Sequence, residues 1–384
     1  RTPIPRTIDL GRIRLQGEIA SITRPSRFPF PIHEPESSEI AAILFTSGST
    51  GVPKGAVYTH KIFQSQVAML RAQYGIQPGE VDLCTFPLFA LFAPGLGMTS
   101  VIPAMNPTRP AWVDSATIKS AIEDFGVTNL FGSPALLKRV AIDAIDHGWK
   151  FPSLKRVVSA GAPVAPRVLE WFSRSLQSDA LIHTPYGATE SLPVCSIDHK
   201  TILRETRAQT DAGAGICVGF PVAGMEVRVI RVTDDPISAW SEELLVPTGT
   251  IGEIVVRGPV VTQSYWNRPA STALAKILDP QSGEILHRMG DVGYLDELGR
   301  LWFCGRKSHR VITGETILYT IPCEAIFNTH PDVARTALVA VQQGGQTRPV
   351  LCVEPLRRLH KQDHERLRAE LLALGATREL TRSI

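Results

Sequence analysis

The chain has 384 residues, of which 20% are charged, and its formal net charge is +3. This length exceeds what a single hydrophobic core usually serves, so we expect a large domain and a smaller one. The basic residues are scattered along the chain, which gives no indication of a nucleic-acid-binding surface. We therefore predict no nucleic-acid partner.

Six cysteines share no CxxC or CxxH spacing, so the sequence indicates neither a metal site nor a disulfide framework. Scattered thiols suit a reducing compartment and no signal peptide is visible, so we predict a cytoplasmic location. The chain begins at Arg1 rather than at Met, and residues 1–37 are rich in Pro and Arg. We therefore expect a chain that is incomplete at its start.

The first chemical motif is TSGSTGVPKG at Thr46–Gly55, after an apolar run at residues 41–45 that is typical of a buried strand. It is not a Walker A loop, because a Val-Pro pair separates Gly51 from Lys54. Its glycines let backbone N–H groups turn towards one anion, and its hydroxyls and Lys54 add donors and a positive charge. A solvated turn is the alternative. The predicted phosphate-binding residues are Thr46, Ser47, Gly48, Ser49, Thr50, Gly51 and Lys54.

The stretch of residues 83–108 carries no charged side chain and could be taken for a membrane span. Its prolines and glycines, however, would break the helix that a bilayer requires. We therefore predict no transmembrane segment, and instead either buried core or the lining of an apolar pocket.

The next part of the chain alternates between helices and strands. The expected helices cover residues 117–125, 134–148 and 164–175, and the expected strands cover residues 154–159 and 180–183. Such alternation predicts an α/β fold with a parallel sheet, whose ligands bind beyond the carboxyl ends of the strands.

After about residue 213, short alternating strands predict a β-rich subdomain packed on the sheet. These strands are expected at residues 225–232, 252–256 and 300–303. From residue 307 onward the pattern indicates a small α+β part, with a helix near 323–329, strands at 335–341 and 350–353, and a final charged helix. We therefore predict a large domain over residues 1–305, β-rich at about 213–305, and a small mobile domain over residues 306–384.

Two short strings follow predicted strands, where such a sheet is expected to bind ligands. In SAGAP at Ser159–Pro163, small residues would let a flat base lie against the backbone. In YGATE, the Tyr186 ring could stack on that base, Thr189 offers a hydroxyl to a phosphate, and Glu190 offers hard oxygen to Mg²⁺. By itself, each string more often marks a structural turn.

Together with TSGSTGVPKG followed by AVYTH, these strings resemble signatures of the adenylate-forming superfamily, which includes acyl-CoA synthetases, luciferases and adenylation domains. SAGAPV is similar to the adenine-binding segment of these enzymes, and YGATES to their nucleotide and Mg²⁺ segment. The resemblance implies ATP as substrate, with Lys54, Thr189 and Glu190 as catalytic residues, Thr189 at the α-phosphate and Glu190 on the metal. Beyond the loop, the implied nucleotide-binding residues are Gly161, Ala162, Pro163, Tyr186, Gly187, Ala188, Thr189, Asp291 and Arg306.

Asp291 and Arg306 belong to a third string, which begins with Met289-Gly290-Asp291. In this superfamily the Asp of that Gly-Asp pair accepts both ribose hydroxyls, and the Arg of a later Gly-Arg pair contacts the same sugar. The resemblance covers residues 40 to about 341. It implies the family fold, a large N-terminal part followed by a small mobile C-terminal domain.

The chain departs from the common family pattern at three sites. After FPLF the family has a His that gates the acid pocket, whereas this chain has Ala90. This implies an apolar acid site suited to a fatty chain, with Phe89, Ala90 and Phe92 as candidate lining residues. At the hinge the family has Asp or Lys, and here His309 takes that place. A third departure is the longer stretch that follows, and together with the hinge change it puts ordinary thioester formation in doubt.

The strings GRKSHRV and LYTIPCEA resemble the olefin-biosynthesis β-lactone synthetases of the same superfamily. This implies that a 2-alkyl-3-hydroxy fatty acid is activated as its adenylate and that its own hydroxyl then closes a β-lactone. The alternative is a long-chain acyl-CoA or acyl-AMP ligase, and only this alternative could need CoA. We further expect a possible complex with other enzymes of lipid or olefin biosynthesis.

The adenylation Lys that the family carries late in its C-terminal domain has no match here. The last Lys of the chain, Lys361, lies in HKQDH, which differs from the family string. We therefore assign no such Lys and expect the chain to be incomplete at its end as well. A third hypothesis stays open for the same reason, a nucleotide-binding module without turnover.

Overall fold

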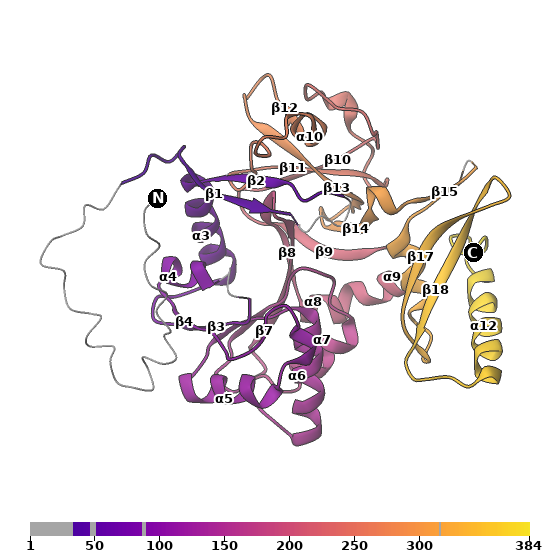
Figure 1. Ribbon diagram of the computed structural model, residues 1–384, viewed down its shortest axis with the longest axis horizontal. Helices are drawn as coiled ribbons and strands as arrows, with labels where there is room; N and C mark the ends of the chain where they lie inside the picture. Colours follow the sequence, from indigo (N-terminus) through magenta and orange to yellow (C-terminus); the bar gives the residue numbers. More distant parts are fainter. Residues whose placement is uncertain (1–33, 47–50, 87–89, 315) are drawn as a thin grey trace, which may run out of the picture.

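The computed structural model describes residues 34–46, 51–86, 90–314 and 316–384, and all structural statements below concern these ranges. Their largest element is a sheet of twelve strands that joins two lobes, one around β3 to β7 and one around β10 to β14 (Figure 1). Its strands are β3 (Val81–Cys84), β4 (Thr99–Val101), β5 (Asn129–Phe131), β6 (Arg156–Val158), β7 (Leu181–Ala188), β8 (Ser191–Asp198), β9 (Ile216–Pro221), β10 (Glu226–Ile230), β11 (Gly252–Arg257), β12 (Lys276–Leu278), β13 (Ile285–Leu295) and β14 (Leu301–Arg306).

The first lobe contains the parallel part of the sheet, in the order β4-β3-β5-β6-β7. Three helices pack with it, α5 (Ser115–Phe125), α6 (Pro134–His147) and α7 (Pro166–Ser173). The sequence specifies where the first two begin, because the side chains of Asp114 and Ser133 accept backbone hydrogen bonds there. Glycines in the left-handed conformation end both helices. The predicted α/β alternation is confirmed.

Strand β7 is five residues longer than the predicted end at His183, because it forms a hairpin with β8. The YGATE string therefore lies on the end of β7 and on the turn that follows it, rather than on a loop. The turn consists of Thr189 and Glu190.

The β-rich part continues the same sheet in antiparallel order. Strand β9 pairs with β8 on one side and with β14 on the other, so the two lobes share one hydrogen-bonded sheet. Beyond β14 follow β13, β11 and β10. The DELGR segment, residues 296–300, connects β13 to β14. Short helices follow in the chain, α8 (His199–Thr201), a π-helix at Ile202–Thr206 and α9 (Arg207–Asp211) after β8, and α10 (Pro269–Ala275) after β11.

A two-stranded sheet of β1 (Ile40–Phe45) and β2 (Gly55–Thr59) carries the predicted phosphate loop between its strands. Strand β2 leads into α3 (His60–Tyr74), whose start is capped by the Thr59 side chain. The uncharged stretch contributes β4, which belongs to the large sheet, and α4 (Phe92–Leu96), which packs against α3 in a small apolar cluster. It is therefore partly core, as expected.

The C-terminal elements pack around a second two-stranded sheet, β17 (Val333–Gln343) and β18 (Gln346–Pro355). Helix α12 (Lys361–Ala376) contributes Leu367 and Leu371 to the cluster between it and this sheet. The remaining elements are β15 (Val311–Thr313), β16 (Thr316–Leu318) and α11 (Thr320–Phe327).

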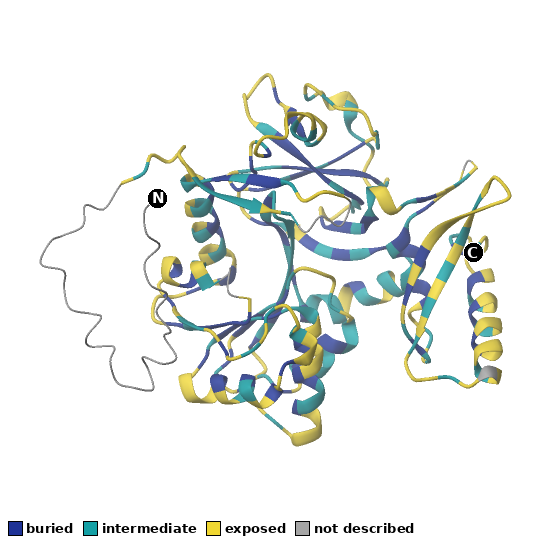
Figure 2. Cartoon of the chain, in the orientation of Figure 1, coloured by how far each residue is buried: buried dark blue, intermediate teal, exposed yellow. Residues whose placement is uncertain are grey.

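Burial is concentrated in the twelve-stranded sheet, which is mostly dark blue or teal in Figure 2, whereas β17, β18 and α12 present many exposed residues. The two largest apolar clusters lie in the two lobes. Within the described part of the chain, no helix is both long and apolar enough to cross a membrane.

Candidate functional site

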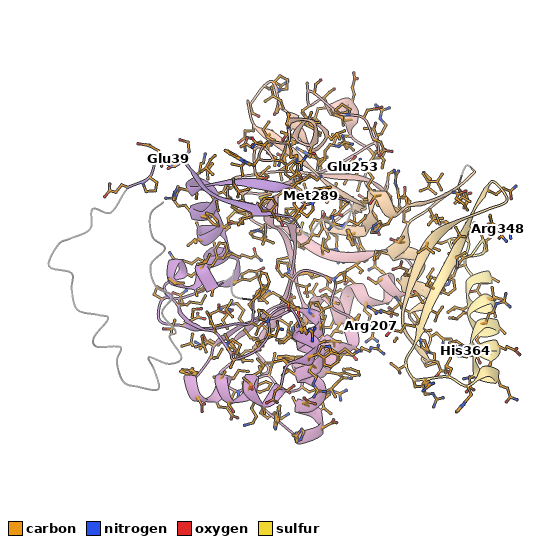
Figure 3. The ribbon with its side chains drawn as sticks, in the orientation of Figure 1. Glu39, Arg207, Glu253, Met289, Arg348 and His364 are labelled. Carbon is orange, nitrogen blue, oxygen red and sulfur yellow. The ribbon has the colours of Figure 1, made fainter. Side chains whose placement is uncertain are left out.

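A cavity of about 1010 Å³ lies where the β1–β2 hairpin, the end of β7 and strands β11 and β13 approach one another. Figure 3 labels two of its lining residues, Glu253 on β11 and Met289 on β13, which lie near the centre of the molecule. The predicted site residues that line the cavity are Thr46, Gly51, Lys54, Phe92, Gly161, Gly187, Ala188, Thr189, Glu190 and Arg306. Five parts of the chain, at residues 46–54, 92, 161, 187–190 and 306, therefore meet at one site.

Ser47, Gly48, Ser49, Thr50 and Phe89 are outside the described residues. Ala162 and Pro163 are exposed next to Gly161 but do not line the cavity.

The base of the phosphate loop is closed by backbone contacts at both ends. The Thr46 N–H donates to the Lys54 carbonyl at 2.9 Å, and the Lys54 N–H donates to Thr46 Oγ1 at 3.1 Å. The Lys54 Nζ lies 5.0 Å from the centre of the Tyr265 ring. This arrangement directs a positive charge to the wall that also holds Glu190.

Glu190 is held in place by two neighbours. Its Oε1 accepts a 2.5 Å hydrogen bond from the Tyr265 hydroxyl, and its carbonyl accepts bonds from the Thr262 N–H and Oγ1 at 2.9 and 3.1 Å. Burial, together with the charge of Glu190, raises the pKa of Tyr265, so the phenol stays protonated and keeps donating. The carboxylate is thus oriented before any ligand arrives.

Lys276 adds a buried amine behind this wall. Its Nζ donates to Thr262 Oγ1 at 3.1 Å, and burial lowers its pKa to about 7 against the opposing effect of Glu190. Sequence reasoning missed both Lys276 and Tyr265. Their partners lie at distant positions in the chain, and no short motif links the pairs.

At the YGATE turn, the backbone at Gly187 lies very close to the backbone at Ser191. A Cβ on Gly187 would lie 2.8 Å from the Ser191 carbonyl oxygen, so only glycine fits there. The Tyr58 hydroxyl donates to the Thr189 carbonyl at 2.6 Å and ties strand β2 to this turn. The side chain of Thr189 is thereby kept at the cavity.

Asp291 and Arg306 face each other across the β13–β14 pair. Arg306 forms a 2.8 Å ion pair with Asp291 Oδ1, and the Tyr186 hydroxyl donates to Oδ2 at 2.6 Å. Burial raises the pKa of Asp291 to about 6, and Arg306 opposes this shift. Tyr186 was expected to stack on the base; its side chain is directed towards Asp291 and Phe303, and neither Tyr186 nor Asp291 lines the cavity.

A second, apolar pocket of about 80 Å³ lies next to the large cavity. Phe92 lines both spaces, as expected for an acyl-pocket residue, whereas Ala90 lines neither and Leu91 takes its place at the large cavity. The reason is local: helix α4 begins at Phe92 and turns that ring inward. At one side of the pocket, Asp82 accepts a hydrogen bond from Asn129.

The predicted hinge residue His309 lies exposed in the turn Lys307–His309 and does not line the cavity. Its neighbour Lys307 does, and donates to the Thr233 carbonyl at 2.9 Å while lying 3.3 Å from the Glu253 carboxylate. The residue at the turn that reaches the site is therefore Lys307, which the sequence analysis left out.

Comparison with known proteins gives a consistent result. A family model described as "AMP-binding enzyme" matches residues 7–266. The chain is 52% identical over 346 residues to an olefin beta-lactone synthetase of Stenotrophomonas maltophilia, covering 89% of this chain and 61% of that protein. It is 51% identical over 351 residues to one of Xanthomonas campestris pv. campestris, covering 91% and 62%. The chain thus spans less than two thirds of the length of these relatives.

A 2-succinylbenzoate–CoA ligase of Geobacillus kaustophilus is 29% identical over 304 residues, covering 79% of this chain and 56% of the ligase. Among solved structures, the amide bond synthetase McbA of Marinactinospora thermotolerans superposes with a TM-score of 0.73 at 24% identity, covering 99% of this chain and 68% of that one. An O-succinylbenzoate CoA synthetase of Bacillus subtilis, in complex with ATP and a magnesium ion, gives 0.68 at 21%, covering 89% and 66%. These superpositions establish the fold.

Proposed function

The chain belongs to the AMP-binding enzyme family, and from this premise we propose that its protein activates a long-chain acid with ATP, forming an acyl-adenylate and pyrophosphate. The observation that carries the proposal is the single cavity lined by Lys54, by Thr189 and Glu190, and by Arg306. A cation, a hydroxyl, a carboxylate and a guanidinium there match the successive parts of a nucleoside triphosphate.

In the proposed first step, a carboxylate oxygen of the acid attacks the α-phosphorus, the bond to the bridging oxygen breaks, and pyrophosphate leaves. Lys54 supplies positive charge at the phosphate tail and Thr189 a hydroxyl at the α-phosphate. We assign the ribose hydroxyls to Asp291, which pairs with the cavity-lining Arg306. Positioning and charge neutralisation lower the barrier of such a transfer.

Glu190 fits the role of the Mg²⁺ ligand. Its carboxylate lines the cavity, it is oriented by Tyr265, and carboxylate oxygen is a ligand that this ion prefers. Bound there, Mg²⁺ would neutralise charge on the phosphates. The protein's own part is to fix that carboxylate in advance.

For the second step we propose that the acid is a 2-alkyl-3-hydroxy fatty acid. Its hydroxyl oxygen attacks the activated carbonyl carbon, the carbon–oxygen bond to AMP breaks, and a β-lactone, AMP and a proton are released. The identity of 52% and 51% to two olefin beta-lactone synthetases supports this reading. An attached nucleophile also has an entropic advantage over an external one.

The second candidate is a long-chain acyl-CoA or acyl-AMP ligase, which the 29% identity to a CoA ligase favours. Both candidates need an apolar acid site, and we assign it to the apolar pocket beside the large cavity. They differ in whether the adenylate is consumed by an internal hydroxyl or by an external thiol.

We also infer a cytoplasmic location. All six cysteines are free, and five of them are buried, which is the state that a reducing compartment maintains. A lipophilic lactone is poorly soluble in water, so direct transfer within a complex of lipid or olefin biosynthesis enzymes would suit this product.

The test is mass spectrometry of the product formed from ATP, Mg²⁺ and a 2-alkyl-3-hydroxy acid without CoA, using the whole protein that carries this chain. We expect β-lactone, AMP and pyrophosphate. Turnover that requires CoA would favour the ligase, and ATP binding without pyrophosphate release would favour a non-catalytic module. The matched control is Glu190→Ala, which should fold normally and release no pyrophosphate; normal turnover would contradict the metal assignment.

A further inference from the structure

The large cavity and the apolar pocket share a boundary of six residues. They are Gln66, Phe92, Phe131, Ala160, Pro185 and Leu192. Of these six, Gln66 alone carries a polar side chain. A ligand that extends from the large cavity into the apolar pocket therefore passes one hydrogen-bonding side chain at this boundary.

Gln66 lies on helix α3, and only 2% of its surface is exposed. Its Nε2 donates to the Leu192 carbonyl at 2.9 Å, which fixes the orientation of the amide. Its Oε1 is buried and accepts no hydrogen bond from any residue in the described part of the chain. A buried acceptor without a partner is unfavourable because it has lost its hydrogen bonds to water, so a ligand group that donates to it is the natural complement.

Gln66 also lies close to the proposed α-phosphate site. Burial raises the pKa of Tyr58 to about 12, and a hydrogen bond from Gln66 partly offsets this effect. The Tyr58 hydroxyl in turn donates to the Thr189 carbonyl at 2.6 Å. A single residue, Tyr58, thus connects the Gln66 amide to the turn that carries Thr189.

This placement constrains the acid. Its carboxyl carbon must lie at the α-phosphate, beside Thr189, while its alkyl chain needs the apolar pocket, so the carbons next to the carboxyl occupy the boundary. We propose that Gln66 Oε1 accepts a hydrogen bond from the hydroxyl at the third carbon and makes Gln66 a specificity-determining residue for 3-hydroxy acids. The proposal rests on the proposed acid activation.

The chemistry agrees with an amide at this position. A hydroxyl that donates its proton to Oε1 leaves its oxygen lone pairs available to the neighbouring carbonyl carbon. When that carbon–oxygen bond forms, AMP leaves with the electrons of its ester bond and the hydroxyl proton passes to water. Gln66 orients the nucleophile and takes up no proton.

The same contact discriminates between acids. An acid without the hydroxyl leaves Oε1 unpaired in a buried site, and sites built to bind a hydroxyl reject such analogues strongly. The wild-type protein should therefore prefer the 3-hydroxy acid over the matched 3-deoxy acid by roughly ten- to a hundredfold in kcat/KM for pyrophosphate release.

The test is Gln66→Met, which keeps the length of the side chain and removes the acceptor. We expect the preference for the 3-hydroxy acid to fall to about one, and the share of adenylate that closes to lactone to fall. The control is Leu70→Met, which lies in the apolar pocket only and should keep the preference. Melting temperatures with ATP verify that both variants fold.

The possible results distinguish the role of Gln66 from the acid activation on which it rests. If Gln66→Met slowed both acids equally, or left the preference unchanged, the assignment of Gln66 would fall while the acid activation stood. If the wild-type protein released no pyrophosphate with either acid, the proposed function would fail, and the role of Gln66 with it.

Discussion

Asp291 is the residue whose ionisation bears most directly on the proposed ribose contact. Burial raises its pKa to about 6, above the ordinary value of 3.8, while Arg306 opposes the shift. Its Oδ1 and Oδ2 already contact Arg306 and the Tyr186 hydroxyl. The carboxyl is therefore positioned before any nucleotide binds, and its charge depends on pH near neutrality.

The pH dependence follows from the direction of the shift. Because the folded-state pKa is raised, the folded protein holds this proton more tightly, and ionising Asp291 costs stability as pH rises from about 4 to about 6. The affinity for ribose hydroxyls changes in the opposite direction and rises with pH, because the hydroxyls donate to the ionised carboxylate. We expect adenosine to bind several-fold more weakly at about pH 5 than at about pH 8, measured by calorimetry.

The matched control for this prediction is Asp291→Asn, which has nearly the same shape and does not titrate. Its affinity for adenosine should be low and independent of pH over that range. A variant that kept the wild-type pH profile would show that another group is responsible.

At the scale of elements, strands β11 and β13 are joined by a buried ion pair between Glu253 and Arg288. The two groups are 2.7 Å apart, and their side chains are 1% and 2% exposed. Arg288 also donates to the carbonyls of Asp235 and Leu274, so one guanidinium ties three segments together beside the cavity. Lys307, 3.3 Å from Glu253, provides a second but weaker partner.

We predict that Arg288→Met lowers the free energy of unfolding by about 3 kcal/mol or more, because it leaves Glu253 buried with an incomplete partner set. Urea denaturation followed by circular dichroism measures this. The control is Arg335→Met, whose ion pair with Glu354 is exposed and should contribute less than about 1 kcal/mol. Equal losses in the two variants would contradict the role given to burial.

At the scale of the whole molecule, the large sheet passes to the C-terminal elements through Gly305 at the end of β14. Its φ is +125°, and a Cβ there would lie 2.6 Å from Thr320 Oγ1 at the start of α11. Helix α11 packs against this end of the sheet. The close approach at Gly305 is thus one place where the sequence determines how the two parts lie against each other.

Gly305→Ala should therefore destabilise the protein by about 1–3 kcal/mol, through both its backbone conformation and the contact with Thr320. Gly344→Ala is the milder comparison, because its φ of +60° lies in the left-handed region and nothing lies within 4 Å of its Cβ position. We expect a smaller loss for Gly344→Ala in the same unfolding measurement. A loss as large as that of Gly305→Ala would mean that the contact with Thr320 contributes nothing.

The sequence by itself determined the family, the chain order of the three motifs and most helices and strands, because each depends on residues that are neighbours in the chain. It predicted that Lys54, Glu190 and Arg306 share a site, and the cavity brings them together. That the Tyr186 ring stacks on a base stays a prediction, and what the structure adds is that the Tyr186 hydroxyl donates to Asp291.

Only the tertiary structure identified Gln66, Tyr265 and Lys276. Gln66 bonds to Leu192 across 126 positions of the chain, and Tyr265 to Glu190 across 75. No local pattern marks such pairs, since a hydrogen bond depends on atoms within about 3 Å and chain folding alone sets that distance. The sequence motifs thus predicted part of the cavity lining, whereas the tertiary structure showed which polar atoms there have partners and which are free to bind a ligand.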